Sequence, residues 1–189
     1  VIQNSTADNL YAVPLLLEQE GLAREVCKHL KLENIEPNNG KWEEMIENIR
    51  NIGEDKINIA IVGKYVQLED SYISVMESLR HAGFVNNVNV DIDLIDCEEV
   101  TAENAKEILG KYKGIIVPGG FGNRGIEGKI QTIKYARENN VPFLGICLGM
   151  QMTVVEFARN VLGLKDANSV EFDEKGRKRS GNIIFNKIL

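Results

Sequence analysis

The sequence feature that most constrains this chain is the segment Gly145–Gln151, which reads GICLGMQ. It follows an apolar run at residues 141–146 and leads into a segment, residues 150–162, with apolar side chains at helical spacing. The apolar positions of that segment are Val154, Val155, Ala158, Val161 and Leu162. This pattern predicts a short buried strand, a tight corner and then a helix. Cys147 would therefore lie at the junction between a strand and a helix.

A cysteine at such a corner is well placed to act as a nucleophile. A tight turn exposes the side chain beyond the end of the sheet, and Gly145 and Gly149 would let the backbone turn without Cβ clashes. The positive end of the following helix favours the thiolate, and the Leu148 N–H would become an oxyanion donor. The alternative is an inert core cysteine, because free cysteine is among the most buried residue types.

A second glycine-rich segment favours the nucleophile. Residues 118–122 read PGGFG and follow another apolar run, residues 114–117. Loops that follow neighbouring parallel strands meet at one edge of an open α/β sheet, which is where such folds bind ligands. Gly120 would then place a second backbone N–H beside Cys147.

From residue 57 the pattern alternates between strand and helix. Strands are predicted at residues 57–62, 88–95 and 114–117, and helices at residues 70–82, 101–109 and 125–138, the second capped by Thr101. The alternation predicts an α/β fold with a Rossmann-like, mostly parallel sheet that has helices on both faces. PGGFG lacks the G-x-G-x-x-G spacing of a dinucleotide site.

The part before residue 57 reads as a helical tail, residues 1–32, and a linker with one amphipathic helix, residues 33–56. Trp42 is expected to be a packing anchor in that helix. The Gly63-Lys64-Tyr65 sequence lacks the Walker spacing. It is interpreted either as a turn with an exposed lysine or as part of an interface between two domains.

The composition excludes several classes of function. A net charge of −6 provides no basic surface for nucleic acid or an anionic membrane. The three cysteines are far apart and do not suggest a disulfide framework, which predicts a reduced, cytoplasmic protein. The sequence contains no apolar run long enough for a membrane span and does not open with a signal peptide.

These motifs together resemble a known family. PGGFG followed by GICLGMQ is similar to the glutaminase domain of the class I glutamine amidotransferases. More narrowly, VGKY at 62–65, PGGFGNRGIEGKI at 118–130 and ANSVEF at 167–172 resemble the CTP synthase family. The similarity spans about residues 1–172, and the tail at residues 173–189 is left unassigned.

The resemblance implies the class I glutaminase fold and a division of the chain. Residues 57–172 would be an incomplete glutaminase domain, residues 33–56 an interdomain linker and residues 1–32 the end of a synthetase (amidoligase) domain. Because the sequence begins with valine, we expect it to be part of a longer chain.

The activity implied by the resemblance is ATP-dependent amination of UTP to CTP. Ammonia would come from glutamine hydrolysed at Cys147, with magnesium and ATP acting in the parent enzyme and no cofactor or metal in this chain. Oxyanion and glutamine-binding roles would belong to Gly120, Leu148, Gly149, Met150, Gln151 and Glu171. The resemblance associates Arg124 with the effector GTP, places an ATP loop near Ser5, Thr6 and Ala7, and implies a homotetramer.

One part of the expected catalytic machinery is missing from the sequence. A thiol that attacks an amide needs a base, commonly a histidine oriented by a carboxylate, and the family supplies both from a downstream H-x-E motif. No histidine follows Cys147, and His29 and His81 are interpreted as surface or packing residues. A non-catalytic glutamine-binding or assembly fragment therefore remains open. A different amidotransferase is disfavoured by residues 11–14 and by ANSVEF.

Overall fold

The computed structural model of the chain describes residues 1–7, 9–33, 36–172 and 183–185. The chain divides into two compact units, of which the first comprises residues 1–54 together with residues 82–89. The second contains the rest of the chain and carries both glycine-rich motifs.

Three short helices build the first unit. A 3₁₀ turn at Leu10–Ala12 leads into α1 (Val13–Gln19), which is followed by α2 (Leu22–Leu30) and α3 (Gly40–Arg50). The indole Nε1 of Trp42 donates to the Tyr11 carbonyl oxygen at 2.7 Å, so α3 is tied to the segment that opens α1. Trp42 is 39% exposed, so its role as a packing anchor stays a prediction. The predicted boundary between residues 1–32 and 33–56 stays a prediction.

A four-stranded sheet organises the second unit. Its strands are β1 (Lys56–Gly63), β2 (Asn89–Asp96), β3 (Gly114–Val117) and β4 (Phe143–Gly145), in the order β2-β1-β3-β4. β3 runs parallel to both β1 and β4, and Val117 is paired with Gly145 at its end. The loops that leave β3 and β4 therefore emerge side by side. The predicted α/β fold with a mostly parallel sheet is confirmed.

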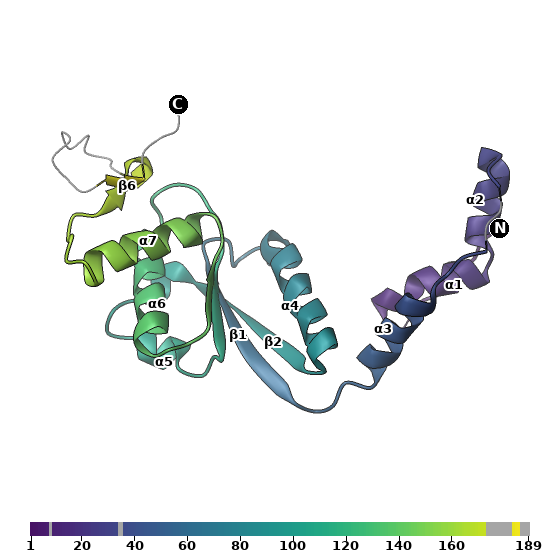
Figure 1. The fold of residues 1–189 in the computed structure, drawn as a ribbon, viewed down its shortest axis with the longest axis horizontal. Coiled ribbons are helices and arrows are strands. Elements are labelled where there is room, and N and C mark those ends of the chain that lie inside the picture. The colour runs from purple at the N-terminus through teal and green to yellow at the C-terminus, as the bar shows by residue number, and fades with distance from the viewer. Residues whose placement is uncertain (8, 34–35, 173–182, 186–189) are drawn as a thin grey trace. The chain divides into compact units, whose positions relative to one another are not determined.

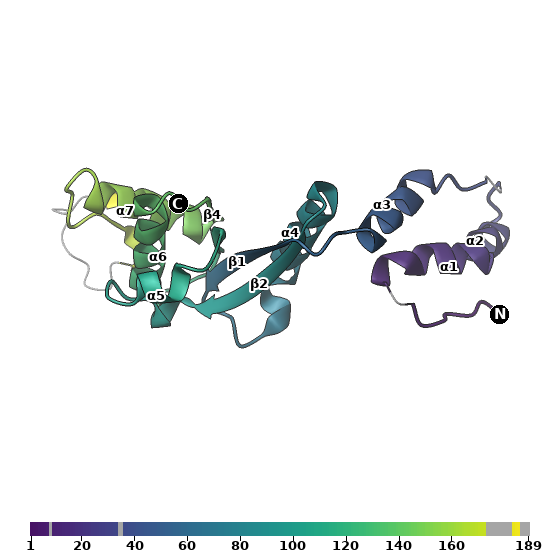
Figure 2. The same ribbon diagram turned by 90° about the horizontal axis from the view of Figure 1, so that it is seen from below.

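Helices cover both faces of this sheet (Figures 1 and 2). On one face Ile61 and Ile116 pack with Tyr72 and with apolar side chains of α4 (Ile73–Asn86). On the other face Ala60 and Val62 pack with α5 (Ala105–Leu109), α6 (Ile126–Glu138) and α7 (Leu148–Asn160). Alternation along β1 sends its side chains into the two cores in turn. Burial on both faces explains the continuous apolar run of this strand.

Two predicted helices have different limits in the structure. A 3₁₀ turn at Glu69–Tyr72 precedes α4, which continues to Asn86, four residues beyond the predicted end. The helix predicted at residues 101–109 shrinks to α5, and Thr101 is not its cap. The Oδ1 of Asn104 accepts the Thr101 N–H at 2.7 Å, and the Asn104 amide donates to Glu99. Local side-chain bonds of this kind compete with helix formation.

The apolar face of α7 is also different from the predicted one. Val155 and Ala158 are buried as the periodicity predicted, but Val154, Val161 and Leu162 are exposed. The helix instead buries Leu148 and Met152, because the packed face begins at the residue directly after Cys147. The strict helical period through Leu148, Met152 and Val155 defines this face.

A small second sheet follows α7. Its strands β5 (Asn168–Ser169) and β6 (Ile183–Phe185) are parallel, and a 3₁₀ turn at Val170–Phe172 follows β5. The unassigned tail otherwise lies outside the described residues. Among the helices that the structure describes, none has the length and apolarity needed to cross a membrane.

Candidate active site

Cys147 occupies a strained corner between β4 and α7. Its backbone angles are φ 52° and ψ −108°, a combination that side chains with a Cβ rarely adopt, and it is the N-cap of α7. Its side chain is exposed, whereas Cys97 is buried. Strain held at a single exposed residue is characteristic of functional sites and costs on the order of 1–3 kcal/mol. The predicted strand-to-helix corner is confirmed, and the core-cysteine alternative is wrong because the thiol is exposed.

The two flanking glycines are required by close backbone packing. A Cβ on Gly149 would lie 1.9 Å from the Val117 carbonyl oxygen, and one on Gly145 would lie 2.7 Å from the Gly149 carbonyl carbon. The Ile146 N–H donates to the same Val117 oxygen at 3.0 Å. The cysteine elbow, residues 145–149, is thus pressed against the end of β3, and only glycine fits at its two ends.

The strain at Cys147 leads to a stability prediction. We expect Cys147→Gly to unfold with a free energy about 1–2 kcal/mol larger than Cys147→Ala, because glycine adopts a positive φ without a Cβ clash and alanine does not. Urea titration of the two variants measures this difference, and neither variant carries the thiol. An alanine variant as stable as the glycine variant would contradict the strained geometry.

The glycine loop, residues 118–122, meets the cysteine elbow as the sequence predicted. A Cβ on Gly119 would lie 3.4 Å from the Cys147 Cβ and 3.8 Å from its Sγ. A Cβ on Gly120 would lie 3.6 Å from the Leu148 side chain. Leu148 is the first residue of α7, where backbone N–H groups have no intrahelical acceptor. The exposed thiol is therefore bordered by a helix N-terminus and by a loop rich in backbone amides.

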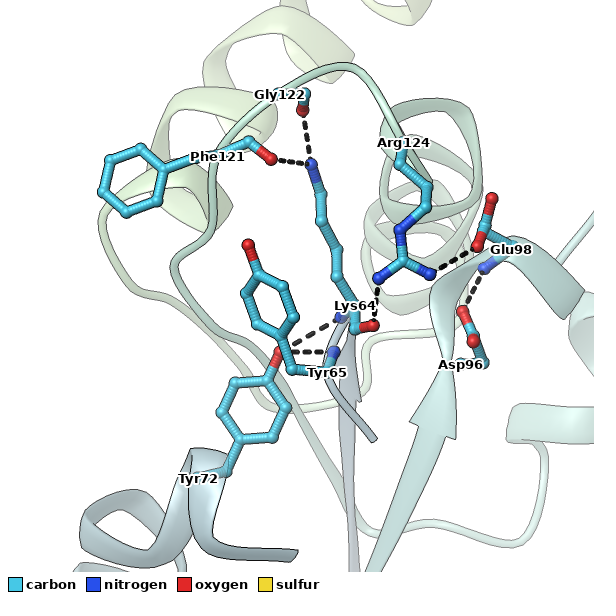
Figure 3. A network of polar contacts seen from close by, with 8 residues as sticks. All are labelled: Lys64, Tyr65, Tyr72, Asp96, Glu98, Phe121, Gly122 and Arg124. Carbon is cyan, nitrogen blue, oxygen red and sulfur yellow. Dashed lines mark hydrogen bonds and ion pairs between the residues drawn. The ribbon is translucent and has the colours of Figure 1, made fainter. Parts of the chain in front are cut away.

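Lys64 connects the end of β1 to the glycine loop (Figure 3). Its side chain is only 2% exposed, and its Nζ donates to the carbonyl oxygens of Phe121, at 3.0 Å, and Gly122. The Tyr72 hydroxyl oxygen accepts the N–H groups of Lys64 and Tyr65 and so holds the start of this segment. The interpretation of residues 63–65 as a turn with an exposed lysine is wrong, because the loop carbonyls bury the amino group.

Arg124 joins the same network from the far end of the loop (Figure 3). One guanidinium nitrogen donates to the Glu98 carboxylate at 2.7 Å, and another donates to the Lys64 carbonyl oxygen. The Glu98 N–H in turn donates to Asp96 at 2.9 Å. The guanidinium is half-exposed, so it is held by two partners while one side faces solvent.

The charges around Lys64 place Glu171 near the loop. Burial lowers the pKa of Lys64, and acidic groups around it, which include Glu171 and Glu98, oppose that shift. Glu171 lies in the 3₁₀ turn after β5, is exposed, and has its N–H bonded to the Ser169 hydroxyl. Glu171 is therefore one of the acidic groups that act on the Lys64 amino group, although it follows the elbow by more than twenty residues.

The remaining residues singled out from the sequence fall into three groups. Gly149, Met150 and Gln151 form the first turn of α7 directly after Cys147. Ser5, Thr6 and Ala7 lie in an irregular segment of the first unit, and their role in an ATP loop stays a prediction. His29 and His81 are both exposed, which confirms them as surface residues.

Sequence reasoning missed two buried lysines of this site. The sequence pattern predicts a turn or interface position for Lys64 and predicts no role for Lys129. Lys129 is fully buried on α6, and its Nζ donates to the Pro118 carbonyl oxygen at 2.8 Å. One signal was available, because Lys129 occupies a position between Ile126 and Ile133 on the apolar stripe of its helix.

Comparison with known proteins agrees with this geometry. The family model described as "Glutamine amidotransferase class-I" matches residues 67–185, which is more than half of the chain. The glutaminase domain of Trypanosoma brucei CTPS, solved with bound acivicin, is 45% identical and superposes with a TM-score of 0.59. That match covers 64% of this chain and 47% of the other.

Curated relatives extend the similarity into the first unit. CTP synthases of Bacillus cytotoxicus and Clostridium acetobutylicum are 55% and 56% identical over 173 residues. Each match covers 92% of this chain and 32% of the relative, so the chain spans about a third of the length of these proteins. On the match of the family model, supported by the cysteine elbow and the adjoining glycine loop, this chain belongs to the class I glutamine amidotransferases.

Proposed function

We propose that this chain carries the glutamine-hydrolysing nucleophile of a CTP synthase, and that the whole protein aminates UTP to CTP at the expense of ATP. The observation that carries the proposal is the strained, exposed Cys147 beside the glycine loop. The identity of more than half of the residues to CTP synthases supports the narrower assignment.

In the proposed reaction the Cys147 thiolate attacks the side-chain amide carbon of glutamine. The carbonyl oxygen becomes an oxyanion, which the N–H groups of Gly120 and Leu148 stabilise by hydrogen bonds. Collapse of this intermediate expels ammonia and leaves a thioester, which water then hydrolyses to glutamate. Gln151 and Glu171 are proposed to hold the amino-acid end of glutamine, since a carboxylate suits the substrate ammonium.

This chemistry needs a base, and no histidine follows Cys147 in the sequence. His81 lies on α4, which packs on the face of the sheet opposite α7, and His29 lies in the first unit. We propose that the whole protein supplies a histidine and a carboxylate from another segment. Without them, each missing proton transfer lowers the rate by about 10²–10⁴. The 189-residue chain would then bind glutamine without appreciable turnover.

The other ligands are proposed for the whole protein. UTP, ATP and magnesium would act in the synthetase reaction, GTP is proposed as an effector that contacts Arg124, and the assembly would be a homotetramer. Among the residues that the structure describes, there is no group of three or more His, Cys, Asp or Glu side chains placed to hold a metal ion.

Acivicin, the ligand of the similar T. brucei domain, tests the proposed site. We expect it to alkylate Cys147 of the 189-residue chain and to leave Cys27 and Cys97 unmodified, as followed by peptide mass spectrometry at short times. Burial raises the pKa of Cys97, which keeps that thiol protonated and unreactive. Glutamine should protect Cys147 from the reagent. Preferential labelling of Cys27 or Cys97, or no protection by glutamine, would refute the assignment.

A further inference from the structure

A fully buried lysine lies beneath the glycine loop. Lys129 on α6 has an exposed fraction of 0%, and its amino group donates to the Pro118 carbonyl oxygen at 2.8 Å. Lysine is almost never fully buried unless its charge has a partner, because burying an ammonium ion is costly. The partner here is a backbone carbonyl of the loop that borders Cys147. The free-energy cost of burying this lysine is therefore incurred beside the candidate active site.

The hydrogen bond at Pro118 determines how the next amide is oriented. A trans peptide is planar, so its carbonyl and its N–H point in opposite directions. With the Pro118 oxygen turned towards Lys129, the Gly119 N–H must point away from that side chain. Gly119 also borders the Cys147 side chain, since a Cβ on Gly119 would lie 3.4 Å from the Cys147 Cβ. Rotation of the peptide between Pro118 and Gly119 would therefore change which backbone N–H groups face the thiol.

Two lysines together hold the carbonyl groups at both ends of the loop. Lys129 binds the first, at Pro118, and Lys64 binds the last two, at Phe121 and Gly122. Both amino groups are enclosed by protein. Because buried amino groups hold these three carbonyls, their oxygens are kept from turning towards a developing negative charge, which they would repel.

The surroundings of Lys129 make its charge sensitive to pH near neutrality. Burial is the main cause that lowers its pKa to about 8, and the charge of Lys64 acts in the same direction. Cys97, beside the start of α6, and Cys147, at the start of α7, oppose the shift. Below this pH the ammonium form predominates, and above it the neutral amine does. An ammonium donates a stronger hydrogen bond than an amine, so the bond to Pro118 weakens as the pH rises.

We propose that Lys129 is a positioning residue for glutamine hydrolysis, because its buried amino group holds the Pro118 carbonyl and thereby fixes the glycine loop against Cys147. The inference rests on the proposed function and adds a residue that touches neither glutamine nor the thiol. Methionine is close to lysine in length but cannot donate, so Lys129→Met removes the hydrogen bond and keeps most of the packing.

The test compares two reagents on the same thiol of the 189-residue chain. Acivicin, as a glutamine analogue, depends on the loop, whereas iodoacetamide reports the reactivity of the thiol alone. We expect Lys129→Met to lower the ratio of the acivicin rate to the iodoacetamide rate at Cys147 by about tenfold, the effect of one lost charge-assisted hydrogen bond. Lys134→Met, the same substitution on the same helix, should leave the ratio unchanged. Circular dichroism and a thermal melt establish that both variants are folded.

A pH series on the unmodified chain provides a second measurement that does not depend on a variant. The same ratio should fall as the pH is raised from about 7 to about 9, through the pKa of Lys129. Any pH dependence that the two reagents share at this thiol cancels in the ratio. The fall should be absent in Lys129→Met if that variant folds.

The outcomes separate this inference from the proposed function. If acivicin fails to label Cys147 in the unmodified chain, the proposed glutamine site is wrong and no positioning role remains. If acivicin labels Cys147 with protection by glutamine, but the ratio is independent of pH and is unchanged in Lys129→Met, the proposed function stands and the role of Lys129 is refuted. A tenfold lower ratio and a pH-dependent fall support the inference.

Discussion

Replacing Cys147 with alanine is expected to abolish glutamine-dependent CTP formation by the whole protein while CTP formation from free ammonia continues. The thiol is the only group proposed to attack glutamine, and loss of a nucleophile typically lowers kcat by about 10⁴–10⁶. The proposed synthetase reaction does not use the thiol, so added ammonia should bypass the missing step. CTP formation is measured in parallel with glutamine and with an ammonium salt at high pH, in the presence of UTP, ATP and magnesium.

The matched control for this experiment is Cys97→Ala. Cys97 is buried and is not proposed to touch glutamine, so its loss should leave both nitrogen sources usable. A folded Cys147→Ala protein that fails with ammonia as well would contradict the proposed division of labour. Rapid hydrolysis of glutamine to glutamate and ammonia by the 189-residue chain would show that this chain contains its own catalytic base.

Replacing Arg137 with methionine is expected to lower the free energy of unfolding by roughly 3 kcal/mol, because it leaves a buried carboxylate without its cation. Glu156 on α7 is 1% exposed, and both of its oxygens accept from Arg137 on α6, at 2.8–3.2 Å. The Asn160 amide adds one bond at 3.1 Å, which cannot neutralise the charge. Urea denaturation followed by circular dichroism measures the loss.

A double-mutant cycle identifies the cause of that loss. Arg137→Met combined with Glu156→Met removes both charges and should recover most of the stability, since an apolar pair of similar volume replaces the buried ion pair. The same substitution at Arg80, whose ion pair with Glu77 is solvent-exposed, should cost less than about 1 kcal/mol. A double variant as unstable as Arg137→Met would mean that lost packing, and not the unpaired charge, destabilises the chain.

Much of the fold could be predicted because each strand and helix of the second unit has its own local pattern. The continuous apolar runs at β1 and β3 predicted strands, and the limits of β3 at residues 114 and 117 were correct. Helix limits were less reliable where local hydrogen bonds compete with helix formation. At Asn104 a side chain took the Thr101 N–H, so the helix started four residues later than predicted.

The candidate site could be predicted only where adjacent residues define it. Cys147 with Gly145 and Gly149 is a local pattern, and its strained corner follows from close packing against Val117. The lysine contacts are different, because Lys64 is 57 residues from Phe121 and Lys129 is 11 residues from Pro118. A lysine in a turn is predicted to be exposed to solvent. No local sequence pattern shows that a loop distant in the sequence will cover it.

The sequence by itself determined the order of strands and helices, the cysteine elbow and its family, because backbone preferences and apolar periodicity act over a few neighbouring residues. The tertiary structure alone decided which carbonyls the two buried lysines hold, that Arg124 binds both Glu98 and the Lys64 carbonyl, and that Glu171 lies near Lys64. These contacts depend on strand order β2-β1-β3-β4, which brings the ends of β1, β3 and β4 to one edge of the sheet. The two lysines bind backbone carbonyls there because burial removes the water that would otherwise solvate their amino groups.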